Sequence, residues 1–293
     1  MLTSKLEVLV DFGAKPESHL IEKTLNELKS QDGVVEAVFK EGAIMVETHL
    51  PSTDILTMVA RSSGKRAVLQ GFGETQSAVA MISSQSCCQS QKVMGVIRFQ
   101  QTGEASLVTD GSIDGLASGM HGLHVYESGD LSQGCESIGG HYDPYGAPHG
   151  GPNDPPEMRH AGDLGNIVAD ETGRATFRLI DNVLNVADII GRSVGVTERK
   201  DDLGKGNTVK SKVDGDSGKP VACGIIARSA GILQNPKRIC ACDGVVVWDE
   251  RDRPLAGKGR REKSCCQKEN SNESNKSSCC QKQSNGVGKD CKV

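Results

Sequence analysis

Aromatic residues and long apolar runs are scarce in this sequence. Phe, Trp and Tyr make up only 3% of its 293 residues, which predicts cores built from aliphatic side chains. No run of about 18 apolar residues occurs, and this excludes a predicted membrane-spanning helix. The first 30 residues are charged throughout and contain no apolar signal region. We therefore expect a cytoplasmic protein, with the mitochondrial intermembrane space and the nucleus as further compartments.

Cysteine is absent before Cys87, although the whole chain contains 11 cysteines. Seven of them lie from Cys240 onward. A reducing compartment does not favour an extended framework of disulfides, so close thiol pairs indicate metal binding or redox chemistry. The formal net charge is only -4, which indicates no nucleic-acid partner.

The length of the chain predicts two or three domains. Residues 1–73 contain a regular succession of strand and helix patterns. Strands are predicted at 6–12, 34–39, 43–48 and 66–70, and helices after Pro16 and from Ser52, which is placed to cap its helix. This βαββαβ order is typical of a small α/β unit with the ferredoxin-like fold.

The rest of the chain divides into a glycine-rich β segment and a polar tail. Residues 74–234 show short strand patterns and loops with Pro and Asn, which predict a β-sandwich or barrel. Within it, the Ser/Gln-rich stretch 74–90 is interpreted as a linker or an extended loop. Residues 235–293 form a third, flexible segment, which from residue 264 has the composition of a disordered tail.

Five of the seven histidines lie between residues 121 and 160. His141, His149, His160 and Asp163 provide three imidazoles and one carboxylate, a set that suits tetrahedral Zn²⁺ in a structural role. Their loop is rich in Gly and Pro and poor in apolar residues, so a bound ion would help to order it. Scattered surface histidines remain the alternative.

Several segments carry a more specific signal. They are Gly122-Leu-His-Val-Tyr-Glu127, Gly140-His-Tyr-Asp-Pro144, His149-Gly-Gly-Pro152, Arg159-His-Ala-Gly-Asp-Leu-Gly-Asn166 and Asp201-Asp-Leu-Gly-Lys-Gly206. From about residue 79 to 231 the chain resembles the copper/zinc superoxide dismutase family, whose fold is an eight-stranded Greek-key barrel. The resemblance implies zinc ligation by the four donors above. It also implies that Asp201 orients metal-bound histidines, and that Cys135 and Cys223 form a disulfide, with two reduced buried thiols as the alternative.

The departures from that family concern its copper site. His124 and His141 match two of the four histidines that hold copper in a dismutase, whereas the other two positions hold Tyr126 and Thr197. The arginine that attracts superoxide is replaced by Pro220. We therefore expect no dismutase activity, although a dismutase enzyme remains one rival interpretation.

Cys240-Ala-Cys242 is the second candidate site. Residues i and i+2 of an extended chain project to the same side, so two thiolates there suit Cu(I) and can exchange with a disulfide. The surrounding stretches, Asn235-Pro-Lys-Arg-Ile-Cys-Ala-Cys-Asp-Gly244 and Arg253-Pro-Leu-Ala-Gly-Lys-Gly-Arg260, resemble the third domain of the copper chaperones that serve superoxide dismutase. On spacing alone, two incidental thiols would be an equal interpretation.

The first domain resembles the small copper-carrier fold but lacks its Met-x-Cys-x-x-Cys motif. The corresponding stretch is Phe12-Gly-Ala-Lys-Pro-Glu-Ser18, so we expect a docking or positioning role. The repeated Ser-Cys-Cys-Gln segments suggest a compensating hypothesis, in which additional Cu(I) binds at Cys265, Cys266, Cys279 and Cys280. A disordered tail whose cysteines have no function is an equal alternative, and palmitoylation of these cysteines is a weaker one.

Together these features predict a metallochaperone rather than an enzyme. The resemblance implies that it takes Cu(I) from an upstream donor, forms a heterodimer with copper/zinc superoxide dismutase and delivers the metal. It further implies thiol exchange that forms the internal disulfide of the client. A homodimer of the free chain is left open. The rival from another class is a cysteine-rich copper/zinc buffering protein, which would need no specific partner.

Overall fold

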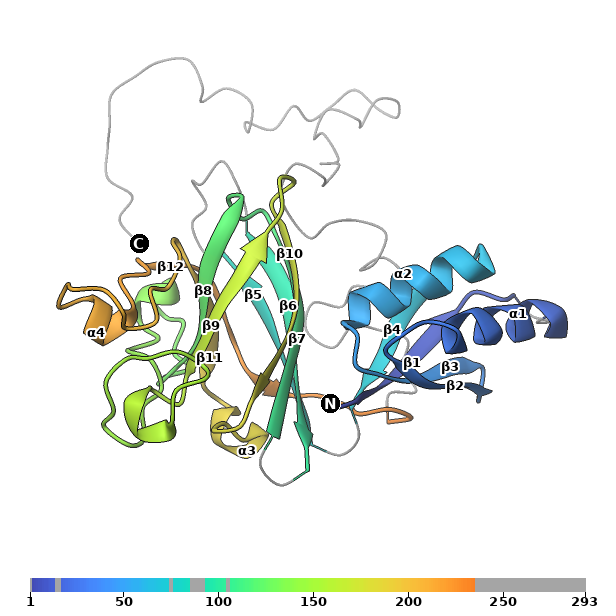
Figure 1. The fold of residues 1–293 in the computed structure, drawn as a ribbon, viewed down its shortest axis with the longest axis horizontal. Coiled ribbons are helices and arrows are strands. Elements are labelled where there is room, and N and C mark those ends of the chain that lie inside the picture. Colours follow the sequence, from blue (N-terminus) through green and yellow to red (C-terminus); the bar gives the residue numbers. More distant parts are fainter. Residues whose placement is uncertain (1, 14–16, 74–75, 85–92, 104–105, 235–293) are drawn as a thin grey trace, which may run out of the picture. The chain divides into compact units, whose positions relative to one another are not determined.

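The fold was analysed in a computed structural model of the whole chain (Figure 1). The structure describes all residues except 1, 14–16, 74–75, 85–92, 104–105 and 235–293. The predicted third segment, with Cys240, Cys242 and the paired tail cysteines, therefore lies outside the described residues. Within the described part, no helix is long and apolar enough to cross a membrane.

The first part of the chain has the predicted βαββαβ order. Its elements are β1 (Ser4–Val10), α1 (Ser18–Lys29), β2 (Val34–Lys40), β3 (Ala43–Thr48), α2 (Ser52–Ser63) and β4 (Ala67–Phe72). The antiparallel sheet has the order β2-β3-β1-β4. Glu41 and Gly42 connect β2 to β3 with positive φ angles of 53° and 84°, as a tight hairpin turn requires. The ferredoxin-like fold is confirmed.

The second part is a closed barrel of antiparallel strands. They are β5 (Ser77–Ser83), β6 (Met94–Thr102), β7 (Ser106–Asp114), β8 (Gly119–Tyr126), β9 (Asp163–Ala169), β10 (Arg174–Asp181), β11 (Ser193–Thr197), β12 (Pro220–Ile225) and the short β13 (Ala227–Arg228). Their order is β12-β11-β8-β9-β10-β7-β6-β5-β13, and the barrel closes where Cys223 of β12 pairs with Ser83 of β5. The non-sequential order confirms the Greek-key prediction. The short helices α3 (Val186–Ile189) and α4 (Ser211–Asp214) lie in loops.

One expectation about this barrel was wrong. The stretch 74–90 was interpreted as a linker or loop, but Ser77–Ser83 forms strand β5. The reason is the alternation of small apolar residues, since Ala78, Ala80 and Ile82 are all buried in the barrel core. The polar composition of the neighbouring residues hid this period of two.

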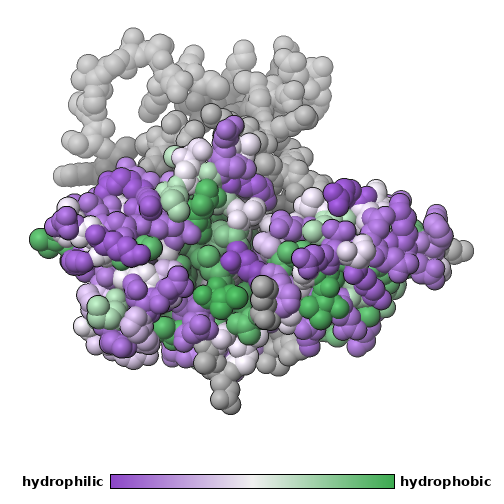
Figure 2. All heavy atoms as spheres, in the orientation of Figure 1, coloured by the Kyte–Doolittle hydropathy of each residue, from purple (hydrophilic) through white to green (hydrophobic). Residues whose placement is uncertain are grey.

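Both cores are mainly aliphatic, as the low aromatic content predicts. Among the buried residues of the large barrel cluster, Phe99 and Phe177 are the aromatic members. The smaller cluster under α1 and α2 has a single buried aromatic residue, Phe72. The face seen in Figure 2 is mostly hydrophilic, with hydrophobic patches between the polar side chains.

Candidate metal centre

The candidate zinc ligands lie on the long connection between β8 and β9 and at the first residue of β9. Backbone hydrogen bonds tie this connection to the barrel, because Tyr142 N donates to Val125 O at 2.8 Å and Val125 N donates to Gly162 O at 2.9 Å. An isolated bridge pairs His141 with Tyr126, the last residue of β8. These contacts place the loop over one end of the barrel strands.

The structure brings all four predicted donors together. One ligand atom from each of His141, His149, His160 and Asp163 lies within 4.8 Å of the others, and all four side chains are largely or fully buried. Asp163 lies at the centre, with its oxygens 2.8 Å, 3.0 Å and 3.4 Å from the Nδ1 atoms of His141, His149 and His160.

Two of these ring nitrogens are buried without a hydrogen-bonding partner, Nδ1 of His149 and Nδ1 of His160. Buried polar atoms are normally paired. Converging nitrogens that lack a partner, beside a buried carboxylate, therefore fit a divalent ion with a tetrahedral N₃O donor set, as Zn²⁺ prefers.

Asp201 holds the outer side of the cluster. Its two carboxylate oxygens lie 2.8 Å from Nε2 of His149 and 3.0 Å from Nε2 of His124. Asn166 fixes Asp201 in turn, because its side chain accepts from Asp201 N and donates to Asp201 O, each at 2.8 Å. A carboxylate in this position orients the imidazole and sets which nitrogen faces the ion.

The charges of the site favour a bound cation. Burial opposes ionisation of Asp163, but its close contacts with the three histidine rings outweigh burial and hold its pKa well below the usual range. Burial likewise opposes protonation of His149, yet the neighbouring carboxylates of Asp163 and Asp201 raise its pKa to about 9. Burial and the neighbouring His124 lower the pKa of His141 to about 3 despite Asp163. The metal-free cluster thus keeps a proton on His149 where an ion would otherwise bind.

The neighbouring position does not fit catalytic copper. Nδ1 of His124 is buried without a partner, and the rings of His124 and His141 are stacked at 3.9 Å. The two other positions that match copper ligands hold Tyr126 and Thr197 in place of histidine. Tyr126 is buried with its ring centre 5.3 Å from that of His141, and burial raises its pKa, so it remains a neutral phenol. Thr197 Oγ1 donates to backbone carbonyls, 3.2 Å from Gly122 O and 3.1 Å from Arg199 O.

Beside Tyr126 opens a cavity of about 1040 Å³. Glu136, Glu198 and Asp214 line it together with Lys219, and Pro220 lies where the resembling family has an arginine. Lys219 forms an ion pair with Glu136 at 3.2 Å. The lining is therefore acidic on balance, which does not suit an anionic substrate such as superoxide.

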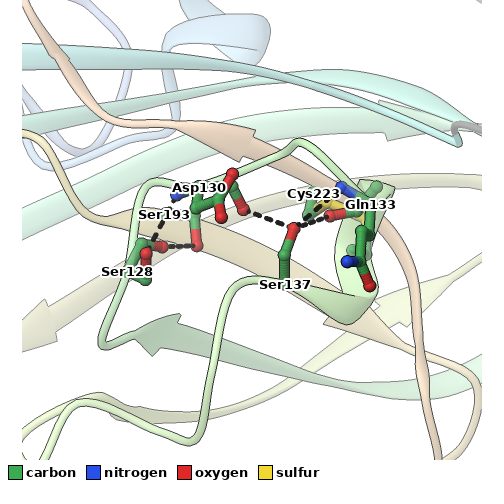
Figure 3. The surroundings of a disulfide bond; sticks show 8 residues. Ser128, Asp130, Gln133, Ser137, Ser193 and Cys223 are labelled. Carbon is green, nitrogen blue, oxygen red and sulfur yellow. Dashed lines mark hydrogen bonds between the residues drawn. A yellow bond between two sulfur atoms is a disulfide. The ribbon is translucent and has the colours of Figure 1, made fainter.

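Cys135 and Cys223 are joined by a disulfide, with Cα atoms 5.8 Å apart (Figure 3). The bond connects the loop before the zinc ligands to β12. Nearby, Ser137 Oγ donates to Asp130 O at 2.9 Å, and Ser193 Oγ of β11 donates to Ser128 O at 2.7 Å. This part of the loop is therefore held both covalently and by hydrogen bonds.

Sequence reasoning missed Arg159, which is fully buried next to His160. Its Nη1 lies 2.7 Å from Asp181 Oδ2 and donates to Pro152 O at 2.9 Å, while Nε donates to His160 O at 3.1 Å. The side chain thereby joins the metal-binding loop to the end of β10. An isolated arginine in a polar loop is normally interpreted as a surface residue, and only its position next to a predicted ligand gave a signal.

Comparisons with known proteins agree with this geometry. Residues 93–226 match the family "Copper/zinc superoxide dismutase (SODC)". "Superoxide dismutase [Cu-Zn] 5" of Dictyostelium discoideum is 44% identical over 141 residues, covering 47% of this chain and 91% of that protein. This similarity concerns the barrel alone.

Other relatives match most of the chain. The "Copper chaperone for superoxide dismutase" of Rattus norvegicus is 47% identical over 264 residues, which cover 88% of this chain and 92% of the relative. The protein of the same name from Homo sapiens is 48% identical over 244 residues, covering 80% and 86%. Identity at this level across both parts of the fold places the chain in the family of copper chaperones for superoxide dismutase.

Proposed function

We propose that this chain carries Cu(I) on Cys240 and Cys242 to copper/zinc superoxide dismutase and promotes formation of the internal disulfide of that client. The observation that carries the proposal is the similarity to copper chaperones for superoxide dismutase over 88% of the chain. The barrel agrees with it, because zinc donors are retained while the second metal position holds Tyr126 and Thr197. A dismutase enzyme would need histidine at those two positions as well.

Docking would use the part of the barrel that resembles the dismutase dimer interface, residues 224–228. Within it, Ile225 is 44% exposed although it is large and apolar, and Ala227 and Arg228 of β13 are exposed. An exposed apolar side chain at the edge of a barrel suits a partner with a similar barrel. We therefore propose a heterodimer with the client, and the homodimer of the free chain would use the same surface.

The transfer itself would take place at the two thiolates. Cu(I) prefers soft sulfur ligands and low coordination numbers, so it can pass to the client by stepwise ligand exchange. For the disulfide, a client thiolate attacks an oxidised Cys240–Cys242 pair. The resulting mixed disulfide is then resolved by the second client thiolate, which leaves the pair reduced. An oxidant such as O₂ must then take up the two electrons to restore the pair.

The zinc donors would have a structural role. His141, His149, His160 and Asp163 supply four donors, which would complete a tetrahedral set and leave no open position for a substrate. Zn²⁺ would hold the β8–β9 connection and, through it, the shape of the barrel end. The chain would act in the cytoplasm, where thiols remain reduced.

The experiment is activation of a client in vitro. The Cu(I)-loaded protein is mixed with copper-free, disulfide-reduced, zinc-loaded superoxide dismutase in the presence of a copper chelator. Wild type should restore dismutase activity, and the variant Cys240→Ser/Cys242→Ser should not. A matched control is Cys291→Ser, which removes a thiol that belongs neither to the proposed pair nor to the repeated Cys-Cys segments. If wild type and the first variant are both inactive, the chain is a metal-buffering relative and the proposal fails.

The paired tail cysteines are tested separately. If Cys265, Cys266, Cys279 and Cys280 acquire additional Cu(I), then replacing all five cysteines after residue 264 with serine lowers the copper content and slows activation. Unchanged copper stoichiometry together with unchanged activation would refute this additional role.

A further inference from the structure

The chain that leaves the barrel after β13 makes contacts with the first domain. Ser229 N still donates to Ser77 O of the barrel at 3.0 Å. Three and four residues later the partners change, because Ile232 N donates to Gly73 O at 2.8 Å and Leu233 N donates to Glu7 Oε2 at 2.8 Å. Residues 231–233, here called the exit segment, therefore contact β1 and the end of β4.

Glu7 is an unusual residue for the middle of a strand. It is only 3% exposed, and its second oxygen accepts from Gln70 Nε2 at 3.0 Å. A buried carboxyl group is costly unless hydrogen bonds compensate for the lost water. Here one of the two compensating donors is the backbone of Leu233, so the exit segment satisfies a polar group that the first domain buries.

The absence of a side chain at Gly71 of β4 allows the backbone of the exit segment to approach this strand closely. A Cβ atom at this position would lie 2.8 Å from Ile232 Cα and 3.1 Å from Gly231 O, both of which belong to the backbone. Real Cβ atoms essentially never show a contact of 2.8 Å, so the backbone of the segment would have to shift if position 71 carried a side chain. The φ angle of Gly71 is not positive, and the close approach is therefore the reason that glycine fits here.

The exit segment also has a fixed backbone shape. Leu233 has a φ angle of 59°, in the left-handed region that branched residues rarely adopt. Such a conformation persists where the surrounding contacts determine it. Gln234 supplies one of these contacts, since its Oε1 accepts from Gly231 N at 3.1 Å.

From these contacts we infer that the first domain anchors the exit segment and thereby limits the reach of Cys240 and Cys242. This inference rests on the proposed function, in which the two cysteines carry copper. Leu233 precedes Cys240 by seven residues. At 3.3–3.6 Å per residue, Cys240 can lie no further than ~25 Å from the anchored amide.

Without the anchor, the last tied residue before the cysteines is Ser229, eleven residues from Cys240. The maximum reach then grows to ~40 Å. A longer tether dilutes the thiols around the docked client, by roughly twofold if local concentration falls as the −3/2 power of length and by about fourfold if it falls with the accessible volume. A domain without a Cys-x-x-Cys motif would in this way still contribute to transfer.

The test compares the full-length wild type with Glu7→Ala/Gly71→Ala. Backbone hydrogen exchange is measured first. The amides of Ile232 and Leu233 should exchange at least tenfold faster in the double variant, while the amides that pair β1 with β3 remain protected. Glu7→Gln keeps a carbonyl acceptor for Leu233 and should behave like wild type. Glu36→Ala removes an exposed carboxyl group from β2 of the same sheet and serves as the matched control.

Client activation is then measured with each variant at equal Cu(I) loading. The double variant should activate the client about two- to fourfold more slowly with unchanged copper stoichiometry, whereas Glu7→Gln and Glu36→Ala should match wild type. Unprotected amides in the wild type, or full activation by a double variant that has lost the protection, would overturn the inference and leave the proposed function intact. If the variant Cys240→Ser/Cys242→Ser of the previous experiment also activates the client, the proposed function fails first, and this role of the anchor fails with it.

Discussion

Replacing Arg159 with methionine should destabilise the barrel more than any change to a surface charge. The guanidinium group is fully buried and forms an ion pair with Asp181, which is 2% exposed, at 2.7 Å. It also satisfies the backbone carbonyls of Pro152, His160 and Ala161 at 2.9–3.1 Å. Methionine has a similar length but no donor, so all of these acceptors would lose a partner at once.

The magnitude follows from the burial of the pair. Removing one partner of a buried ion pair leaves an uncompensated charge and costs about 3–5 kcal/mol. For a domain of this size, 1 kcal/mol corresponds to a shift of about 2–4 °C in Tm, so the variant should melt roughly 6–20 °C lower. Because Arg159 also holds the carbonyl of His160, a predicted zinc ligand, the affinity for Zn²⁺ should fall by about 10–100-fold.

The assay is denaturant unfolding of the full chain with and without Zn²⁺, followed by competition with a zinc chelator. Lys219→Met is the matched control, since Lys219 forms an ion pair of 3.2 Å with Glu136 but both side chains are exposed. Removing such a pair costs about 0–1 kcal/mol. If Arg159→Met unfolds within about 1 kcal/mol of wild type, the buried pair does not hold the loop and the reasoning is wrong.

Three further predictions concern the same part of the molecule. The pKa of His149 is raised to about 9, so its ring is protonated at pH 7.5 and must lose that proton to bind an ion. Zn²⁺ binding should therefore release about one proton from this residue in a weakly buffered titration, and His149→Gln should abolish the release. Replacing Cys135 and Cys223 with serine should lower the free energy of unfolding by about 4–5 kcal/mol, because the bond closes a loop with a sequence separation of 88 residues; loss of less than about 1 kcal/mol in urea unfolding would contradict this. The variant Tyr126→His/Thr197→His should bind Cu(II) and show the signal of histidine-bound copper in electron paramagnetic resonance. An equal signal from the wild type would show that Tyr126 and Thr197 do not prevent copper binding at this position.

The parts of the fold that could be predicted are those with a local period or a specific motif. The βαββαβ order followed from the succession of strand and helix patterns. His141, His149, His160 and Asp163 were found because their residue types suit one ion, and the structure brings them within 4.8 Å. Their role as zinc ligands stays a prediction.

The features that escaped prediction depend on partners far away in the sequence. Ser52 was expected to cap α2, yet it is the first residue of that helix, and both its backbone N and its Oγ donate to Asp110 of β7. Arg159 lies in a polar loop with no local sign of burial, because its partner Asp181 is at the end of β10. Glu7 lies in a predicted strand, and its partner Leu233 is 226 residues away in the sequence. Nothing in a local window identifies such partners, because only the folded chain brings them together.

The candidate zinc site and the proposed copper site differ in their donors, as a permanently bound structural ion and a transported ion require. In the proposed function, three imidazoles and Asp163 would hold Zn²⁺ with four protein ligands, and Asp201 would orient one of them, His149. Release from such a site requires the loop to open, and the disulfide and Arg159 oppose that opening. A cargo needs the reverse, namely few ligands on a segment that can approach another protein. A second four-histidine site in the barrel would compete with the client for copper. The neutral phenol of Tyr126 and the occupied hydroxyl of Thr197 remove that competitor without disturbing the zinc cluster next to it.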